Sequence, residues 1–254
     1  MLGMKKQATK LEDNTVSIAQ CPLCESITVH LYYMEDAKTK SKSKWYACAC
    51  GLIWQVPYPE FVYDKTYLVP DGKKFEKASK YLIKVVNPII EESMYGRRCL
   101  MVGHNKPMAE EMAARGWITH CIDKNVDIPS TSRHIQGDFE TFEFPADLKY
   151  NLLWMYQTLE CMRNPFETLK KAKDLLAEDG IIYIATPDTD FLYTRSPSGF
   201  HHWNKSHNHI MWSQRALESY LEKLGFNIIL SRKNHEVRFP AQDDFWCVAQ
   251  KKFF

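Results

Sequence analysis

The second half of the chain alternates short apolar runs with amphipathic segments. Apolar runs after residue 97 read RCLMVG, ITHCID, SRHIQGD, YNLLWMY and IIYIATP, and segments with helical spacing read PMAEEMAARG, NPFETLKKAKDLLAEDG and SQRALESYLEKLG. The pattern predicts strands for the first kind and helices for the second. Because strands that alternate with helices form a mostly parallel sheet covered on both faces, we expect an α/β fold.

Punctuating residues support these predicted elements. Gly116, Gly180 and Gly225 stand where the three helices are expected to end, and Ser213 is a suitable N-cap for the third. The last two strands, FNIILSRK and FWCVAQKK, have no helical pattern between them. We therefore expect them to pair as an antiparallel hairpin at the end of the sheet.

Near the N-terminus the pattern is of hairpin strands, SITVHLYYM, KTKSKSKWYA and LIWQV, with a cysteine pair before the first and after the second. The pairs are Cys21 with Cys24 and Cys48 with Cys50, and Gly51 follows where a turn needs a permissive backbone. Four thiolates from two tight turns can enclose a tetrahedral Zn²⁺, which predicts a small zinc ribbon. The alternative is a reduced hairpin whose cysteines only pack.

Composition narrows the function classes. The chain has 254 residues, 33 Lys+Arg, 31 Asp+Glu and a formal net charge of +2, with 45% hydrophobic residues. This composition is that of a globular protein, and the near-neutral charge gives no bulk electrostatic argument for nucleic acid or membrane binding. No apolar run approaches the roughly 20 residues that cross a bilayer, and no secretory signal is evident. We expect a cytoplasmic protein without a membrane partner.

The chain divides into four predicted regions. Residues 1–20 are polar and expected to be flexible, 21–56 form the ribbon, 57–96 are a linker and helical region, and 97–254 form the α/β domain. Alternate lysines in the ribbon could contact phosphates, but a solvated charged loop is the favoured interpretation. These lysines are Lys38, Lys40, Lys42 and Lys44.

The turn after the first strand of the α/β domain is the candidate binding site. Gly103 separates this strand from the next helix, and Asp123 ends the second strand 20 residues later. In open α/β sheets ligands bind beyond the carboxyl ends of the strands, and an acidic residue at this spacing can accept hydrogen bonds from ribose hydroxyls.

At these residues the chain resembles the class I S-adenosylmethionine-dependent methyltransferases, especially bacterial and phage members with an N-terminal zinc ribbon. The motifs that carry the resemblance are CPLC…CACGLIWQVPYPE, YDKTY, CIDKN, QGDFE, YNLLWMYQTLECMRNPFETLKKAKDLLAEDGIIYIATPDTD and SQRALESYLEKLGF. The resemblance implies a Rossmann-like, seven-stranded, mostly parallel sheet whose last strand is antiparallel. It also implies S-adenosylmethionine as cofactor.

The resemblance assigns roles by position. Gly103, His104 and Asn105 would meet the amino-acid end of the cofactor, Asp123 the ribose, Asp138 and Phe139 the adenine, and Tyr156 the methyl group; Lys124 is a further cofactor-binding candidate. The first turn departs from the family pattern, because Met101 replaces an acidic residue and Asn105 and Pro107 replace two glycines.

Residues 188–212 form a long connection rich in histidine. Long loops in compact domains are often functional, so His202 and His209 are candidate bases for a methyl acceptor. The predicted function is methyl transfer to a small-molecule or sugar-type acceptor. The alternatives are a catalytically inactive relative that binds or assembles, and a nucleic-acid-modifying protein guided by the basic ribbon.

Overall fold

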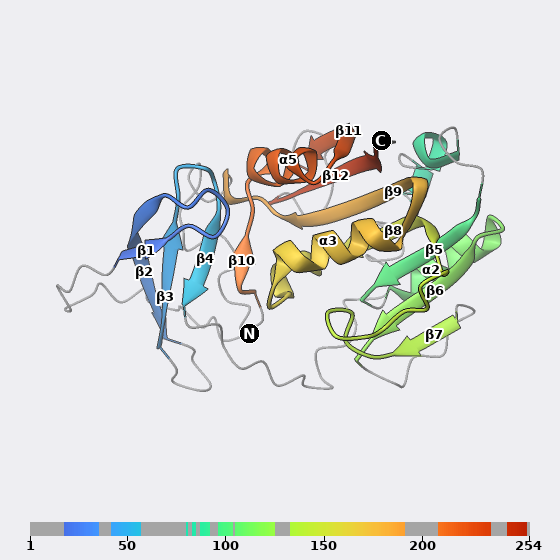
Figure 1. Ribbon diagram of the computed structural model, residues 1–254, viewed down its shortest axis with the longest axis horizontal. Coiled ribbons are helices and arrows are strands. Elements are labelled where there is room, and N and C mark those ends of the chain that lie inside the picture. The colour runs from blue at the N-terminus through green and yellow to red at the C-terminus, as the bar shows by residue number, and fades with distance from the viewer. Residues whose placement is uncertain are drawn as a thin grey trace, which may run out of the picture.

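The computed structural model describes residues 18–35, 42–56, 80, 83–84, 87–91, 96–103, 105–124, 133–190, 208–234 and 243–252. Within these residues the chain forms a seven-stranded and a five-stranded β-sheet (Figure 1). Most of the predicted flexible N-terminus and of the predicted linker lies outside the described residues, so the proposed division into four regions stays a prediction.

The larger sheet has the strand order β11-β12-β9-β8-β5-β6-β7. Neighbours from β9 to β7 run parallel, and β12 is antiparallel to both β9 and β11. This confirms the predicted fold class, including the antiparallel last strand. The strands are β5 (Arg98–Val102), β6 (Ile118–Asp123), β7 (Arg133–Gln136), β8 (Tyr150–Tyr156), β9 (Leu176–Pro187), β11 (Phe226–Lys233) and β12 (Asp244–Lys251).

The helices include α2 (Lys106–Ala114), the short 3₁₀ helix η2 (Leu159–Cys161), α3 (Pro165–Leu175) and α5 (Gln214–Lys223), and residues 87–91 of the predicted helical region are helical as well. Ser213 caps α5 as predicted, because its hydroxyl oxygen accepts from the Ala216 N–H. The prediction that α3 continues to Gly180 is wrong. The backbone becomes extended at Leu176, whose buried side chain belongs to β9 and which pairs with Tyr150 of β8.

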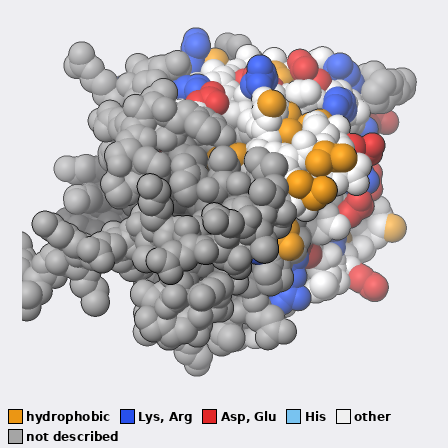
Figure 2. Space-filling view, turned by 90° about the vertical axis from the view of Figure 1, so that its left-hand side faces the viewer, with side chains coloured by type: hydrophobic (Ala, Val, Ile, Leu, Met, Phe, Trp, Pro, Cys, Tyr) orange, Lys and Arg blue, Asp and Glu red, His pale blue; other side chains and the backbone are white. Residues whose placement is uncertain are grey.

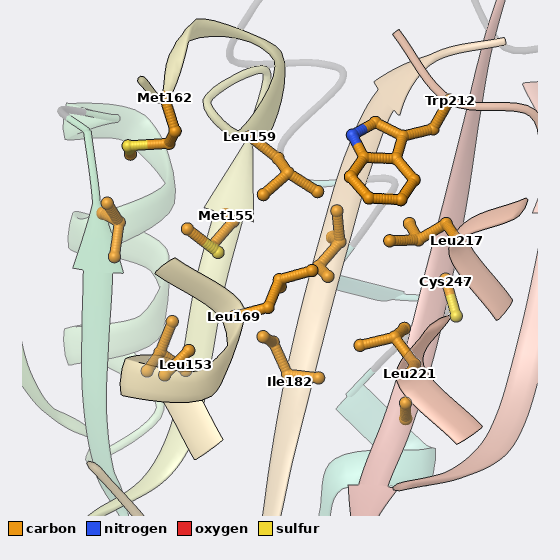
Figure 3. Packing of buried hydrophobic residues seen from close by; sticks show 14 of the residues in the cluster. Leu153, Met155, Leu159, Met162, Leu169, Ile182, Trp212, Leu217, Leu221 and Cys247 are labelled. Carbon is orange, nitrogen blue, oxygen red and sulfur yellow. The ribbon is translucent and has the colours of Figure 1, made fainter. Parts of the chain in front are cut away.

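Buried side chains pack on both faces of the large sheet. On one face, Leu169 of α3 points toward Ile182 of β9, and Leu217 of α5 lies near Cys247 of β12 (Figure 3). On the other face, α2 covers a second cluster that contains the stacked rings of Trp154 and Tyr183. Because successive residues of a strand point to opposite faces, the near-continuous apolar runs of the central strands supply both clusters.

The smaller sheet has the order β1-β2-β3-β4-β10, with β1 (Ile18–Gln20), β2 (Ile27–Glu35), β3 (Lys42–Ala47), β4 (Ile53–Val56) and β10 (Ile210–Met211). Strands β2, β3 and β4 are the predicted hairpin strands. β1 was not predicted, because residues 18–20 fall within the predicted flexible N-terminus, but they pair antiparallel with β2. The fifth comes from the predicted α/β region and pairs antiparallel with β4, beside which it lies in Figure 1.

The pairing with β10 joins the two sheets into one packed structure. Cys48, Leu52 and Trp54 of the ribbon belong to the same buried cluster as Trp212 and Leu217.

On the face seen in Figure 2, the coloured part carries Lys and Arg side chains interspersed with Asp and Glu side chains. Across the described parts of the chain, no helix has both the length and the apolar character to cross a membrane.

Candidate functional site

The turn after β5 and the end of β6 lie next to each other at the carboxyl edge of the sheet. Val102 and Ile122 are register partners in the parallel β5–β6 pair, so Gly103 and Asp123 follow at the same level. Gly103 has φ +82° and its N–H donates to the Ile122 carbonyl at 3.0 Å. Asp123 is only 7% exposed at the end of its strand. The structure therefore brings these two predicted site residues together.

Asn105 has a structural role in the same turn. Its side-chain oxygen accepts from the Met108 N–H at 3.0 Å and caps α2, and Pro107 lies in the first turn of that helix. Proline suits this position because its missing N–H would have no partner inside the helix. The two replaced glycines are thus compatible with a regular strand–turn–helix connection. His104 lies outside the described residues.

Thr158 was not singled out from the sequence, yet it contacts this turn. Its hydroxyl lies 3.0 Å from the carbonyl oxygens of both Val102 and Tyr156, and thereby links the carboxyl ends of β5 and β8. A Cβ built on Gly103 would lie 3.1 Å from the Thr158 hydroxyl oxygen. The preceding Gln157 has a left-handed φ of +53°. Left-handed non-glycine residues often mark functional sites.

The predicted adenine-binding residues behave differently from each other. Asp138 follows β7, accepts from the Glu140 N–H at 3.0 Å and forms an ion pair with Lys124 at 2.8 Å. This pair crosses the ends of β6 and β7 at the expected edge. Phe139 is 3% exposed and packs in the core near Phe144, with the Lys171 ammonium 5.5 Å from its ring centroid.

Tyr156 ends β8 beside buried carboxylates. Burial, followed by the negative charges of Asp244 and Glu160, raises the pKa of the Tyr156 phenol well above its ordinary value. The side chains of Asp244 and Glu160 are themselves 2% and 1% exposed. The phenol therefore stays protonated near neutral pH and can donate a hydrogen bond.

His209 lies directly before β10 and bonds to the segment after β8. The His209 backbone N–H donates to the Glu160 carbonyl at 2.8 Å. The Glu160 carboxylate accepts from the Thr186 hydroxyl at 3.0 Å. Burial, with smaller contributions from the charges of Arg163 and Lys124, lowers the pKa of His209 to about 4. Its ring is therefore neutral near pH 7. The other candidate base, His202, lies outside the described residues.

At the end of β9, Lys233 forms ion pairs with the buried Asp188 and the half-exposed Asp190. The Lys233 ammonium lies 3.0 Å from Asp188 and 2.7 Å from Asp190. Burial raises the pKa of Asp188, and the nearby Lys233 ammonium partly offsets this effect. The pair connects β11 with the end of β9, and so fixes the point from which the chain leaves toward residues 191–207.

A separate hollow of about 510 Å³ lies elsewhere on the molecule. It is lined by residues such as Phe144, Lys149 and Lys171, and Lys149 directly precedes β8. It therefore borders the amino end of β8, opposite to Gly103 and Asp123.

The four N-terminal cysteines form one cluster. The sulfur atoms of Cys21, Cys24, Cys48 and Cys50 all lie within 4.8 Å of one another. The Cys21–Cys50 and Cys24–Cys48 sulfur distances are 3.7 and 3.4 Å. Zinc–sulfur bonds of about 2.3 Å in a tetrahedron place sulfurs about 3.8 Å apart, so the cluster fits one Zn²⁺.

Backbone hydrogen bonds close both of the turns that carry these cysteines. Cys21 donates its N–H to the Ser26 carbonyl at 2.8 Å, and Cys48 donates to the Leu52 carbonyl at 2.9 Å. Gly51 has φ +94°, as the permissive position predicted from the sequence requires. The Ser26 hydroxyl, 2.7 Å from the Cys24 sulfur, lowers the pKa of this thiol to about 6. A thiolate is the form that binds metal.

Comparison with known proteins agrees with this architecture. The family model described as "Methyltransferase domain" matches residues 76–231, whereas a search of curated proteins finds no match. A SAM-dependent methyltransferase from Archaeoglobus fulgidus has a TM-score of 0.55 and 16% identity, covering 74% of this chain and 100% of that one.

Two further solved structures are similar. The 1,6-didemethyltoxoflavin-N1-methyltransferase of Burkholderia thailandensis has a TM-score of 0.51 and 14% identity, covering 72% of this chain and 80% of its own. Magnesium protoporphyrin IX methyltransferase of Synechocystis has a TM-score of 0.52 and 8% identity, covering 77% and 91%. Both are described with S-adenosylhomocysteine bound, and at these identities the likeness concerns the fold. Since the family model covers more than half of the residues, the chain belongs to the methyltransferase domain family.

Proposed function

We propose that this protein binds S-adenosylmethionine at the carboxyl ends of β5 and β6 and transfers its methyl group to a small-molecule acceptor. The observation that carries the proposal is the pairing of the left-handed Gly103 turn with the buried Asp123 on the adjacent strand. Ligands bind at this edge in open α/β sheets. The sulfonium cofactor supplies the reactive methyl group when it is bound.

The described residues fit the cofactor in complementary ways. Asp123 would accept hydrogen bonds from ribose hydroxyls, and Gly103 allows the left-handed turn of the backbone at the same edge. The Lys124–Asp138 pair borders the same edge. Asn105 is assigned to capping α2 rather than to direct contact, and Phe139 supports this edge from the core.

The acceptor is proposed to lie over the ends of β8 and β9. Tyr156 would donate a hydrogen bond to it, since its phenol stays protonated. A pKa of about 4 makes His209 a weak base, so we assign it a positioning role through Glu160 rather than proton abstraction. Methyl transfer needs alignment of donor and acceptor, and a strong base only when the acceptor is protonated. Similar proteins described as acting on small molecules support this acceptor class.

Calorimetric titration with S-adenosylhomocysteine tests the cofactor site. We expect saturable binding to the wild type, at least tenfold weaker binding to Asp123→Asn, and wild-type binding to the control Asp147→Asn. Asp147 is an exposed aspartate shortly before Tyr150, at the amino end of β8 and thus away from the carboxyl edge that carries Asp123. No heat at millimolar ligand with the wild type would refute the proposal and leave a binding or assembly role for the fold.

We also propose that the cysteine cluster binds one Zn²⁺. The proposal rests on four sulfur atoms within 4.8 Å of one another in turns whose backbone surrounds them. Elemental analysis of protein purified under reducing conditions should give one zinc per chain. Cys21→Ser should lose it, and a metal-free wild type would contradict this site.

A further inference from the structure

We propose that Gly51 is a positioning residue through which the cysteine turn fixes the acceptor side of the methyltransferase site. This inference rests on the proposed function for what the acceptor side does. The contacts on which it is based join one turn, Cys48–Leu52, to residues more than 130 positions later in the chain. Its test therefore does not depend on methyl transfer.

The Gly51 carbonyl is the first part of this connection. It accepts from the Thr189 hydroxyl at 2.8 Å and from the Ser213 N–H at 3.0 Å. Thr189 follows β9, and Ser213 begins α5. These two donors stand on either side, in sequence, of residues 191–207, so one carbonyl oxygen ties together both flanks of that connection.

The Gly51 α-carbon is the second part. A Cβ built there would overlap the Ser213 hydroxyl oxygen and lie 2.7 Å from the Ser213 Cβ. The residue has φ +94° as well. Glycine is therefore needed twice, for the backbone angle and for close approach to the α5 cap. Beside it, the Arg215 guanidinium donates to the Ala49 carbonyl at 3.1 Å.

The contacts continue from β10 to the methyltransferase sheet. Ile53 and Trp54 of β4 pair with Met211 and Ile210, and the Gln55 N–H donates to the His209 carbonyl at 2.9 Å. His209 in turn donates its backbone N–H to the carbonyl of Glu160 in η2, the 3₁₀ helix that follows β8. The turn that carries Cys48 and Cys50 is thus connected, through β4 and the hydrogen bonds of residues 209–211, with η2, the segment that follows β8.

If zinc binding changes the conformation of the turn that carries Cys48 and Cys50, these contacts would pass the change on to the acceptor side of the site. The cofactor side, at Gly103 and Asp123, has its backbone bonds and strand pairing with β5, β6, β7 and the residues that directly follow them, and the Thr158 hydroxyl bonds to Val102 beside Gly103. We therefore expect the turn to control residues 208–213 and the end of β9 without controlling cofactor affinity.

Hydrogen exchange, resolved to single amides and followed on the full chain, tests this directly. In Gly51→Ala the His209 and Ser213 amides should exchange at least tenfold faster than in the wild type, while β5 amides stay protected. Gly116→Ala is the matched control. Gly116 also has a left-handed φ of +82°, but a Cβ built there would lie no closer than 3.6 Å to another residue, at the Arg97 guanidinium. It should leave residues 209–213 unchanged.

A rescue variant separates positioning from general damage. Ser213→Gly removes the atoms that a Gly51 Cβ would meet, and glycine is a tolerable N-cap. The double variant Gly51→Ala/Ser213→Gly should recover protection at His209 relative to Gly51→Ala alone. Zinc removal by chelation should imitate Gly51→Ala at residues 209–213. Unchanged protection there in Gly51→Ala, or in zinc-free protein whose β5 stays protected, would overturn the proposal.

S-adenosylhomocysteine titration distinguishes this proposal from the proposed function. Its affinity for Gly51→Ala should remain within twofold of the wild type, and a larger loss would overturn the restriction to the acceptor side. If the wild type does not bind this ligand but the exchange results are as expected, the proposed function fails and the connection through Gly51 stands.

Discussion

The molecule has two glycine turns with the same backbone handedness and different surroundings. Gly51 has φ +94° and lies against the Ser213 side chain with its carbonyl bonded twice. Gly103 has φ +82°, and its nearest neighbour to a new Cβ is the Thr158 hydroxyl oxygen at 3.1 Å. The Gly51 turn is closely packed where the two sheets meet, and we call this contact the joint. The Gly103 turn lies at an edge where ligands bind in this class of fold.

This difference shows that a glycine in a turn has a meaning only together with its neighbours. A left-handed backbone angle excludes most side chains at both positions. At Gly51 a Cβ would overlap the Ser213 side chain, whereas at Gly103 it would be a tight contact with the Thr158 hydroxyl oxygen, and the proposed role of this second turn is to border a ligand. Changes at the joint should therefore act on stability, and changes at the Gly103 turn on cofactor affinity.

The largest expected effect is loss of metal from the joint. Cys48→Ser should release zinc and lower the melting temperature by about 10 °C or more, since each kcal/mol of stability shifts it by roughly 2–4 °C in a chain of this size. The matched control is Cys161→Ser, a partly buried cysteine outside the cluster. Calorimetry with metal analysis measures both. A zinc-free Cys48→Ser protein that melts with the wild type would show that the ribbon is not part of the cooperative structure.

The next effect concerns His209, whose backbone N–H donates to the Glu160 carbonyl. Its pKa is about 4 in the folded protein and about 6.5 when unfolded. Between these values the unfolded chain binds more protons, so the contribution is fully present above pH 6.5 and is lost as the pH falls toward 4.

Denaturant unfolding at pH 7 and pH 5 measures this contribution. We expect His209 to account for about 2 kcal/mol of the decrease in unfolding free energy between these pH values. In His209→Gln, whose side chain does not titrate, the decrease should be smaller by that amount. An identical pH dependence in the two proteins would show that His209 is not buried in its neutral form.

The sequence predicted the elements at both turns better than their connections. Ser213 was expected as the α5 cap and is one, because an N-cap depends on residues within one helical turn. Its second role, donation of its N–H to Gly51, joins residues 162 positions apart and has no local signal. The two-residue strand β10 is likewise too short for a periodic pattern.

Local patterns also failed where two elements meet. The amphipathic run after Asn164 continues past Leu175, but β9 pairing begins at Leu176 and ends the helix there. Tertiary pairing overrides helix propensity at such a boundary. Thr158 escaped notice for a related reason, since a lone threonine after a strand gains significance only when β5 and β8 are placed side by side.

At the cofactor turn, Gly103→Ala should have a moderate effect on stability and a larger one on binding. A left-handed alanine costs about 1–2 kcal/mol, and the same strain applies to Gly116→Ala at an equal φ of +82°. Gly103→Ala should unfold at a somewhat lower denaturant concentration than Gly116→Ala, because its new Cβ also lies 3.1 Å from the Thr158 hydroxyl oxygen. Only Gly103→Ala should weaken S-adenosylhomocysteine binding, and equal affinities in the two variants would argue against the proposed site.

The smallest effect is expected at Asn105, where the chain offers a close internal control. Asn105 and Asn164 both cap a helix with their side-chain oxygen and are both followed by proline in its first turn. Each Asn→Ala substitution should cost about 0.5–2 kcal/mol of unfolding free energy, because one N–H at the helix start loses its partner. If the Gly103 turn is a binding edge, Asn105→Ala should also reduce S-adenosylhomocysteine affinity several-fold, while Asn164→Ala should not. Equal affinity in both variants would mean that the start of α2 does not contribute to the cofactor site, and the site would then rest on Gly103, Asp123 and the residues after β8.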